Sequence, residues 1–319
     1  MKNIWLDGIM GIIVGDALGM PVQFLSREEV RKNPITDMRG YGTFNKPEGT
    51  WSDDGSLTIA TMQSIYDKGG IDCEDIMENF ADWLLEGRFT PFGEAFDEGN
   101  TCVKAITHYV RNQNTETCGV TGEWANGNGA LMRIMPVCLY GYEKVQEGIL
   151  KEEEVLNLVH RVSALTHNHL RSKMACGIYY FLVKTILSGK YDVKEAIQVG
   201  MNEAKAYYQK DVENYMEFSH YGRMFDIETF SKLDEQEIKS TGYVVDSLEA
   251  AVWSFLNGKT FEEVALISVN LGKDTDTVGA IACGLAGVYY GYEGIPEKWL
   301  EKIQRRSKIE EKCERFGIR

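Results

Sequence analysis

The sequence predicts an all-α protein. Apolar residues recur at intervals of three and four along nearly the whole chain, which is the spacing of one helix face. No convincing run alternates apolar and polar residues in the way that a half-buried strand does. In chain order, helices are expected over residues 3–19, 56–68, 73–87, 98–112, 129–142, 152–165, 170–188, 194–208, 243–256, 260–270, 277–291 and 296–305.

Two of these segments, near the two ends of the chain, carry stripes of glycine at helical spacing. Glycine inside a helix costs about 1 kcal/mol relative to alanine, so close packing against a neighbouring backbone is the expected reason for it. We expect the two helices to form the centre of the fold. The glycines are Gly8, Gly11, Gly15 and Gly19 in the first segment and Gly279, Gly284, Gly287 and Gly291 in the second.

Stretches rich in glycine, asparagine, proline and charge predict loops at 35–51, 88–93, 113–128 and 209–242. The last is the longest, and its many aromatic residues and acids indicate an ordered excursion over the surface. We hypothesise that it shapes the entry to a ligand cleft. No linker, fixed-period repeat or low-complexity tract divides the chain, so residues 1–319 are predicted to form a single domain.

The charge balance narrows the classes of partner. The chain has 48 acidic and 34 basic residues and a net charge of -14, which argues against nucleic acids and anionic membranes. Its seven cysteines are scattered and include no CxxC pair, as expected of reduced thiols in a cytoplasmic protein. Asp7 and Asp16 interrupt the apolar N-terminal segment, so no membrane span is expected. Nothing resembles a coiled coil, and a monomer is expected.

Two acidic clusters lie far apart in the sequence, each where a helix is predicted to begin. Both offer carboxylates and hydroxyls, the hard oxygen ligands of Mg²⁺, Mn²⁺ or Ca²⁺. Two divalent ions would balance four carboxylates and suit a hydrolase. Taken singly, each cluster is more simply explained as a helix cap or as acids that complement the helix dipole. The clusters are Ser52-Asp53-Asp54 and Asp274-Thr275-Asp276-Thr277.

Three further groups of residues have both a chemical and a structural interpretation. The turn Gly127-Asn128-Gly129 can present backbone N–H groups to a phosphate, or be a plain connector. His167, in a His-Asn-His motif, suits a metal ligand less well than a structural or polar contact. Asp97 and Asn100 lie at a predicted loop–helix junction, as a cap or as a general base with an orienting amide.

Taken together, the motifs resemble the ADP-ribosylglycohydrolase family, which includes the dinitrogenase reductase-activating glycohydrolase and the ADP-ribosylhydrolases. An early paired-aspartate motif combined with a late Asp-Thr-Asp-Thr motif is highly specific. The matching segments, in chain order, are Gly15-Asp16-Ala17-Leu18-Gly19, Ser52-Asp53-Asp54, Phe96-Asp97-Glu98-Gly99-Asn100, Gly127-Asn128-Gly129-Ala130-Leu131-Met132-Arg133, Leu165-Thr166-His167-Asn168-His169, Gly242-Tyr243-Val244-Val245-Asp246 and Asp274-Thr275-Asp276-Thr277-Val278-Gly279.

The resemblance implies a compact, orthogonal multi-helix fold with a binuclear metal cleft. It implies hydrolysis of the glycosidic bond between ADP-ribose and a protein side chain, with two Mg²⁺ or Mn²⁺ ions. Asp97 would be the acid/base and Asn100 would position the substrate. Gly127, Asn128, Gly129 and His167 would receive the pyrophosphate and proximal ribose, and Tyr243 would flank the leaving side chain. The implied metal ligands are Ser52, Asp53, Asp54, Asp274, Asp276 and Thr277.

One departure from the family pattern bears on the substrate. Many relatives carry a glutamate four residues after the Gly-Asp-Ala-Leu-Gly motif, where this chain has Gln23. An amide cannot take a proton as a base. Because that glutamate is associated with the serine-specific branch, Gln23 favours an arginine-linked ADP-ribosylated protein, or a small ADP-ribosylated molecule, as substrate. Two alternatives stay open: an inactive ADP-ribose-binding or structural protein, and a two-metal phosphoesterase.

Overall fold

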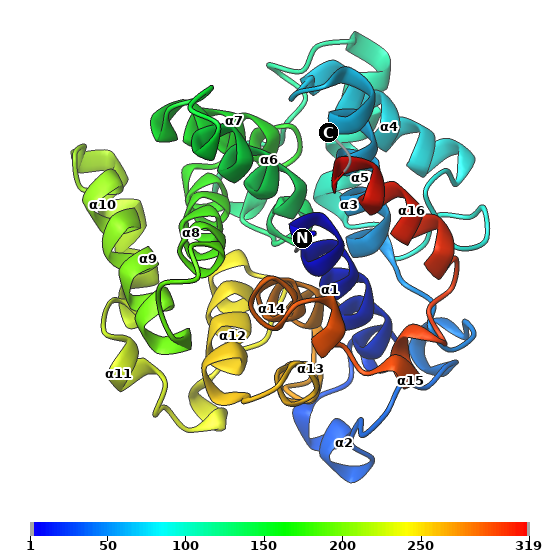
Figure 1. The fold of residues 1–319 in the computed structure, drawn as a ribbon. Coiled ribbons are helices and arrows are strands. Elements are labelled where there is room, and N and C mark those ends of the chain that lie inside the picture. Colours follow the sequence, from blue (N-terminus) through cyan, green and yellow to red (C-terminus); the bar gives the residue numbers. More distant parts are fainter. Residues whose placement is uncertain (1–2, 318–319) are drawn as a thin grey trace. The chain divides into compact units, whose positions relative to one another are not determined.

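The computed structural model describes residues 3–317, and over that range the protein is all-α. Sixteen α-helices are joined by loops and 3₁₀ turns (Figure 1). The extended pairings described are isolated bridges, Tyr41 with Lys46 and Val120 with His167. The all-α prediction is confirmed.

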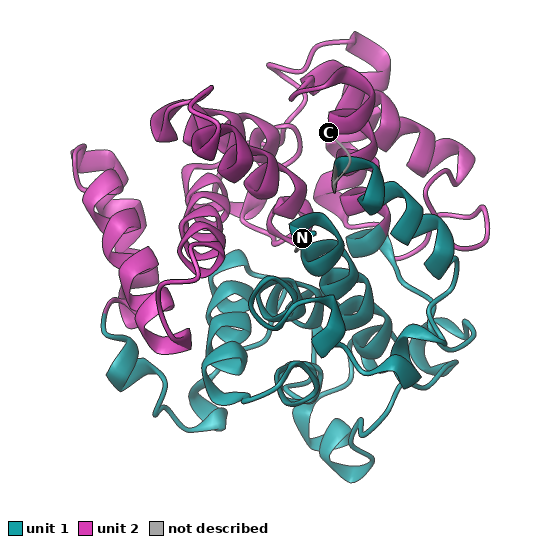
Figure 2. Cartoon of the chain, in the orientation of Figure 1, with its two compact units in different colours: residues 1–55, 226–319 teal, residues 56–225 magenta. Residues whose placement is uncertain are grey.

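The chain packs into two compact units, coloured teal and magenta in Figure 2. Unit 1 is discontinuous and comprises Met1–Gly55 and Asp226–Arg319, whereas unit 2 is the central segment Ser56–Phe225. The helix α3 (Asp53–Lys68) begins in unit 1 and runs into unit 2. The single domain over residues 1–319 stays a prediction.

Unit 1 is built on the pairing of two helices, α1 (Ile4–Gly19) and α14 (Thr275–Tyr290), which lie side by side in Figure 1. The predicted glycine stripes bring their backbones together. A Cβ atom on Gly15 would lie 2.2 Å from the carbonyl oxygen of Gly279, and one on Gly11 would lie 2.2 Å from that of Cys283. No side chain fits at such distances, so these positions require glycine.

The remaining helices of unit 1 cover this pair. Helices α12 and α13 pack on α14, and α16 packs on α1, where the rings of Trp5 and Phe316 stack with centroids 3.8 Å apart. The bounds of these and the short helices are α2 (Arg27–Lys32), α11 (Ile227–Phe230), α12 (Val244–Asn257), α13 (Phe261–Val269), α15 (Glu297–Leu300) and α16 (Arg306–Gly317).

The segment Ile4–Val22 is the one part of the described chain that is long and apolar enough to span a membrane by length and composition. Of its most apolar window, 89% is buried inside the fold. Packing against α14 accounts for this apolarity, because a core helix has the same composition as a membrane span.

Unit 2 is centred on α8, which packs against α7 on one side and α9 on the other. The pair α4 and α5 and the helix α6 complete the unit. Their bounds are α4 (Cys73–Glu86), α5 (Asn100–Asn112), α6 (Met135–Gln146), α7 (Glu152–Ala164), α8 (Leu170–Leu187), α9 (Val193–Tyr208) and α10 (Val212–Phe218).

The predicted loop 209–242 is largely ordered into short helices, as expected of an ordered excursion. It holds α10, a 3₁₀ turn over Ser219–Phe225, α11 and a second 3₁₀ turn over Glu235–Glu237. Capping aspartates begin three of these elements, among them Asp211 and Asp226. All seven cysteines of the chain are buried and carry thiols.

Candidate functional site

The first acidic cluster is held in place by Asp16, a residue of α1. The backbone N–H of Ser52 donates to both carboxylate oxygens of Asp16, at 2.9 Å each, and that of Gly55 donates to Oδ2 at 2.9 Å. A carboxylate from another helix thus caps the start of α3, and it holds Asp53 and Asp54 in the first turn of that helix.

The second cluster opens α14, where the capping explanation for Asp274 is wrong. Asp274 occupies the N-cap position, but its side chain makes no capping hydrogen bond. The start of the helix is fixed by other contacts. The Thr275 hydroxyl donates to the carbonyl of Gly19 at 2.8 Å, and the Asp274 N–H donates to the carbonyl of Ser240 at 3.0 Å. The Asp274 carboxylate therefore does not cap α14.

The two clusters lie together inside unit 1. Carboxylate oxygens of Asp16, Asp54 and Asp276 all lie within 4.8 Å of one another, and the three residues are fully buried. The Ser52 hydroxyl lies 3.2 Å from Asp54 Oδ2, and the Thr277 hydroxyl lies 3.5 Å from the same atom. Asp54 is thus the residue that joins the cluster on α3 to the cluster on α14.

This arrangement fits a divalent cation. At an effective dielectric constant of about 20, two negative charges 4.8 Å apart repel each other by about 3 kcal/mol. Fully buried carboxylates at this spacing are costly unless a cation compensates them. The donors are all oxygen atoms, which suits Mg²⁺ or Mn²⁺ better than Zn²⁺. The group Asp16, Asp54 and Asp276 can hold a metal ion.

Gln23 lies at the edge of this cluster. Its Nε2 donates to Asp274 Oδ1 at 3.5 Å, and its buried Oε1 accepts no hydrogen bond from the described residues. Backbone hydrogen bonds hold it there, from Phe24 N to Lys273 O and from Lys273 N to Leu25 O, each 2.6 Å long. Phe24 and Lys273 both have positive φ, 69° and 63°, which is strain of the kind that gathers at functional sites.

Tyr243 also belongs to unit 1. It occupies the N-cap position of α12, and a Cβ atom on the preceding residue, Gly242, would lie 3.3 Å from Asp274 Oδ2. The segment that carries Tyr243 therefore runs directly beside the acidic cluster. Tyr243 is half-buried.

Within unit 2, the structure brings the turn Gly127–Gly129 against His167. A Cβ atom on Gly129 would lie 2.9 Å from His167 Cε1 and 3.0 Å from the sulfur of Cys102. The sequence predicted that this turn runs directly into a helix, and that prediction is wrong. The turn leads into a 3₁₀ turn over Leu131–Arg133, and α6 begins only at Met135. There is thus no room for a side chain at Gly129, and its backbone lies directly beside the imidazole.

Hydrogen bonds fix the tautomer of His167. The guanidinium of Arg133 can only donate, so at 2.7 Å the Thr166 hydroxyl accepts from its Nη2. The hydroxyl has a second lone pair, but its own hydrogen has no acceptor among the described residues other than His167 Nδ1, 2.9 Å away. We therefore assign that hydrogen to Nδ1 and the ring proton of His167 to Nε2. Burial and the charge of Arg133 lower the pKa of His167 to about 3. The ring is therefore a neutral Nε2–H donor beside Gly129.

We expect Thr166→Val to release this tautomer. Without the hydroxyl, His167 Nδ1 loses its donor and both neutral tautomers become populated, while buried Arg133 loses an acceptor at a cost of about 1–3 kcal/mol. Ring ¹⁵N chemical shifts of His167 measure the change. Thr166→Ser, which keeps the hydroxyl, should retain the Nε2–H form and show no titration above about pH 4. An unchanged spectrum in the valine variant would refute the assignment.

Asp97 and Asn100 lie at the start of α5, in unit 2. Asn100 is exposed and is the first residue of the helix. The N-cap position is occupied by Gly99, so no side chain at that position caps the helix. Asp97 is half-buried and has a φ of 61°, an uncommon conformation for a residue other than glycine. Cys102 belongs to the start of α5, and its sulfur would lie 3.0 Å from a Cβ atom on Gly129. The start of α5 therefore lies beside the Gly127–Gly129 segment that faces His167.

Sequence reasoning placed Asp16, Arg133 and Thr166 within the family motifs but gave none of them a role in these sites. Asp16 and Arg133 each had a signal that could have been used. Asp16 is an acid inside the most apolar segment of the chain, and such an acid needs a buried partner. Arg133 is fully buried over the ring of Phe80, with the guanidinium carbon 4.5 Å from the ring centroid.

Comparison with known proteins points to one family. A family model described as ADP-ribosylglycohydrolase matches residues 5–319. ADP-ribosylarginine hydrolase Tri1 of Serratia proteamaculans is 28% identical over 97% of this chain and 77% of its own length. ADP-ribosyl-[dinitrogen reductase] glycohydrolase of Rhodospirillum rubrum is 29% identical over 94% and 90%. A solved structure titled ADP-ribosylglycohydrolase-related protein complex matches with a TM-score of 0.76 and 28% identity, covering 98% of this chain and 96% of that one.

Proposed function

The chain belongs to the ADP-ribosylglycohydrolase family, and we propose that it is a metal-dependent hydrolase that releases ADP-ribose from arginine side chains of target proteins. The observation that carries this proposal is the buried, all-oxygen group of Asp16, Asp54 and Asp276 in unit 1. One relative supports the arginine linkage, because it is named for ADP-ribosylarginine, and another supports a protein target, because it is named for ADP-ribosyl-[dinitrogen reductase].

We propose that the cation ligands are those that the resemblance implies, with Asp16 as their anchor. Asp16 already holds two backbone N–H groups at the start of α3, so it orients Asp54 as well as adding charge. Bound Mg²⁺ or Mn²⁺ would polarise sugar hydroxyls and a water molecule. The ligands in this proposal are Ser52, Asp53, Asp54, Asp274, Asp276 and Thr277.

Unit 2 supplies groups that suit a diphosphate. His167 is a neutral donor through Nε2–H, and the glycines of the turn Gly127–Gly129 leave backbone N–H groups uncovered by side chains of their own. We propose that these donors bind the pyrophosphate of ADP-ribose. In the same proposal Asp97 transfers the proton to the leaving group and Asn100 orients the substrate, because a carboxylate and an amide suit those tasks.

Gln23 is the basis for preferring the arginine linkage. Its amide is buried against Asp274, where it can donate or accept a hydrogen bond but cannot remove a proton. A reaction that needs a carboxylate at this position is therefore disfavoured. An N-glycosidic reaction in which Asp97 is the acid/base places no such demand on Gln23.

The test is release of free ADP-ribose from arginine-linked and serine-linked peptides, compared with Mg²⁺, with Mn²⁺ and with a chelator. We expect metal-dependent release from the arginine-linked peptide and at least a hundredfold slower release from the serine-linked one, a difference of about 3 kcal/mol in the barrier. The products are separated by chromatography, so that cleavage of the pyrophosphate is seen as AMP.

Three outcomes would contradict the proposal. Release of AMP would indicate a phosphoesterase, and binding of ADP-ribose without turnover would indicate a binding protein. Equal release from both peptides would remove the linkage preference. Gln23→Glu is the matched variant, and it should raise serine-linked release relative to arginine-linked release if Gln23 sets the preference.

A further inference from the structure

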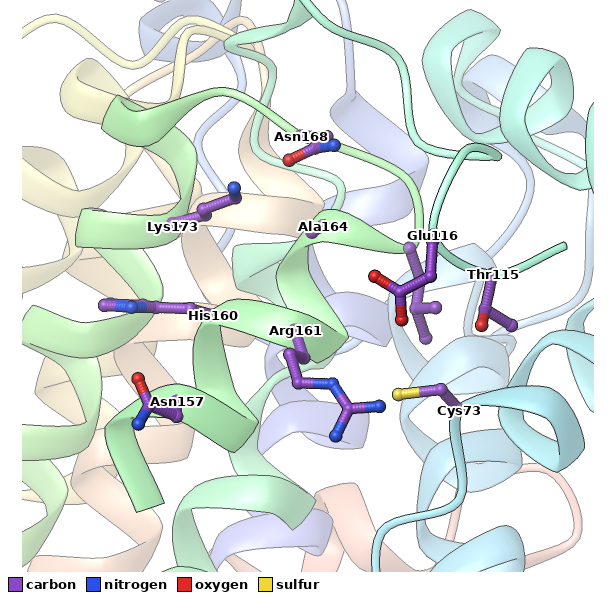
Figure 3. A pocket seen from close by; sticks show the side chains of 10 residues that line it. Cys73, Thr115, Glu116, Asn157, His160, Arg161, Ala164, Asn168 and Lys173 are labelled. Carbon is purple, nitrogen blue, oxygen red and sulfur yellow. The ribbon is translucent and has the colours of Figure 1, made fainter. Parts of the chain in front are cut away.

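A cavity outside the sites described above lies wholly within unit 2. Its volume is about 410 Å³, and it is bounded by α7, the start of α8, the loop before Cys118 and the first residue of α4, Cys73. Figure 3 shows its polar side chains, with Arg161 and Glu116 on the side of Cys73 and with His160, Asn157 and Lys173 on the other side. It shares no lining residue with the acidic cluster, the turn Gly127–Gly129 or His167.

Two cations line this cavity without an acidic partner. No carboxylate of the described residues lies within 4.0 Å of the amine of Lys173 or the guanidinium of Arg161. Lys173 is half-buried, and loss of water around its amine lowers its pKa. The chain has a net charge of -14, so acidic residues are plentiful. Two cations without an acidic partner therefore indicate that the cavity favours an anion.

Another cavity of unit 2 shows the contrast. That cavity, of about 500 Å³, is lined by Lys184, whose amine lies 2.7 Å from Glu152 and 2.6 Å from Glu203. These two carboxylates neutralise the charge of Lys184. The cavity at Lys173 has only one lining carboxylate, Glu116, and that side chain is exposed.

The remaining walls favour a ligand with hydroxyl groups. The amide side chains of Asn157 and Asn168 make no hydrogen bond with the described residues. The only ring in the lining is that of His160, whose Nε2 lies 2.7 Å from the Tyr208 hydroxyl. Burial lowers the pKa of His160 to about 4, so it adds no charge near neutral pH. No phenyl or indole ring is present to stack a nucleobase.

We propose that this cavity is a second ligand site, which binds a small sugar phosphate. Arg161 and Lys173 would hold the phosphate, since both offer several charged donors. Asn157, Asn168 and Glu116 would then bind hydroxyl groups of the sugar. A volume of about 410 Å³ is sufficient for a pentose or hexose phosphate.

Calorimetric titration of the protein with ribose 5-phosphate tests the proposal. We expect submillimolar binding that weakens at least tenfold in Lys173→Met and in Arg161→Gln, because each loses charge-assisted hydrogen bonds. Lys190→Met, which removes an exposed lysine outside the cavity, is the matched control and should bind as the original protein does. Free ribose and inorganic phosphate should each bind more weakly than the sugar phosphate.

The variants separate this site from the acidic cluster. Arg161 is exposed and Lys173 has no ion pair to lose, so both variants should keep the original melting temperature and the original affinity for ADP-ribose. Absence of binding at 10 mM ligand, or binding that neither variant changes, would overturn the proposal. Tighter binding of AMP than of ribose 5-phosphate would overturn the assignment to a sugar phosphate.

Discussion

Asp54→Asn is expected to abolish the binding of divalent metal and to lower turnover by about a thousandfold, equivalent to about 4 kcal/mol in the barrier. Asp54 is fully buried, and its Oδ2 lies within hydrogen-bond distance of hydroxyls from both clusters. The amide keeps the size of the side chain but removes the charge that a cation needs. Calorimetry with Mn²⁺ and the peptide-release assay measure the two effects.

The stability of the metal-free protein distinguishes a metal centre from a structural cluster. In a metal centre, Asp54→Asn relieves repulsion between buried carboxylates, so the metal-free variant should melt above the metal-free original protein, and added metal should no longer stabilise it. In a structural cluster, the substitution would lower the melting temperature and leave the response to metal unchanged. That second result would contradict the proposed metal site.

Asp246→Asn is the control for a carboxylate of the same unit outside the cluster. Asp246 Oδ2 accepts from the Thr241 hydroxyl at 2.6 Å, in the first turn of α12. Its substitution should change stability by about 1 kcal/mol and leave the affinity for metal unaltered. A loss of metal binding in this variant would show that the effect of Asp54→Asn is not specific.

The ligand chemistry of the acidic clusters was readable from the sequence, but the way in which Asp16 anchors them was not. Residue types alone indicate hard oxygen ligands, because aspartate and threonine side chains offer nothing else. Asp16 acts through the backbone N–H groups of Ser52 and Gly55, and a backbone group carries no signature in the sequence. The link from Arg133 through Thr166 to His167 was hidden for a related reason, since it depends on which atoms meet after packing.

Except for α6, which begins at Met135 and not at residue 129, the long helices were predicted within a few residues, whereas several short or polar ones were missed. Helices buried on one face keep an apolar stripe, but α16 is polar and was not expected. The predicted helix 296–305 is wrong beyond Leu300, and Arg305 has a φ of 61° just before α16 begins. The helix α2 was missed although Ser26 and Glu29 form a capping box that the sequence displays.

The α1–α14 contact allows a second large effect to be predicted, from Gly15→Ala. Alanine favours an isolated helix by about 1 kcal/mol over glycine. Here its Cβ would lie 2.2 Å from the carbonyl oxygen of Gly279, and a backbone atom cannot rotate away as a side chain can. Forcing the two helices apart costs about 3 kcal/mol or more. We expect a net loss of at least about 2 kcal/mol in the free energy of unfolding, measured by urea denaturation.

Gly222→Ala is the matched control, because a Cβ atom there would meet nothing closer than 3.9 Å. It should change the free energy of unfolding by less than about 0.5 kcal/mol.

In Gly15→Ala the affinity for metal should also fall. Asp16 follows Gly15 on α1 while Asp276 lies on α14, so separating the helices separates the two carboxylates. If stability falls and metal affinity does not, the α1–α14 contact supports the fold but does not set the geometry of the metal site.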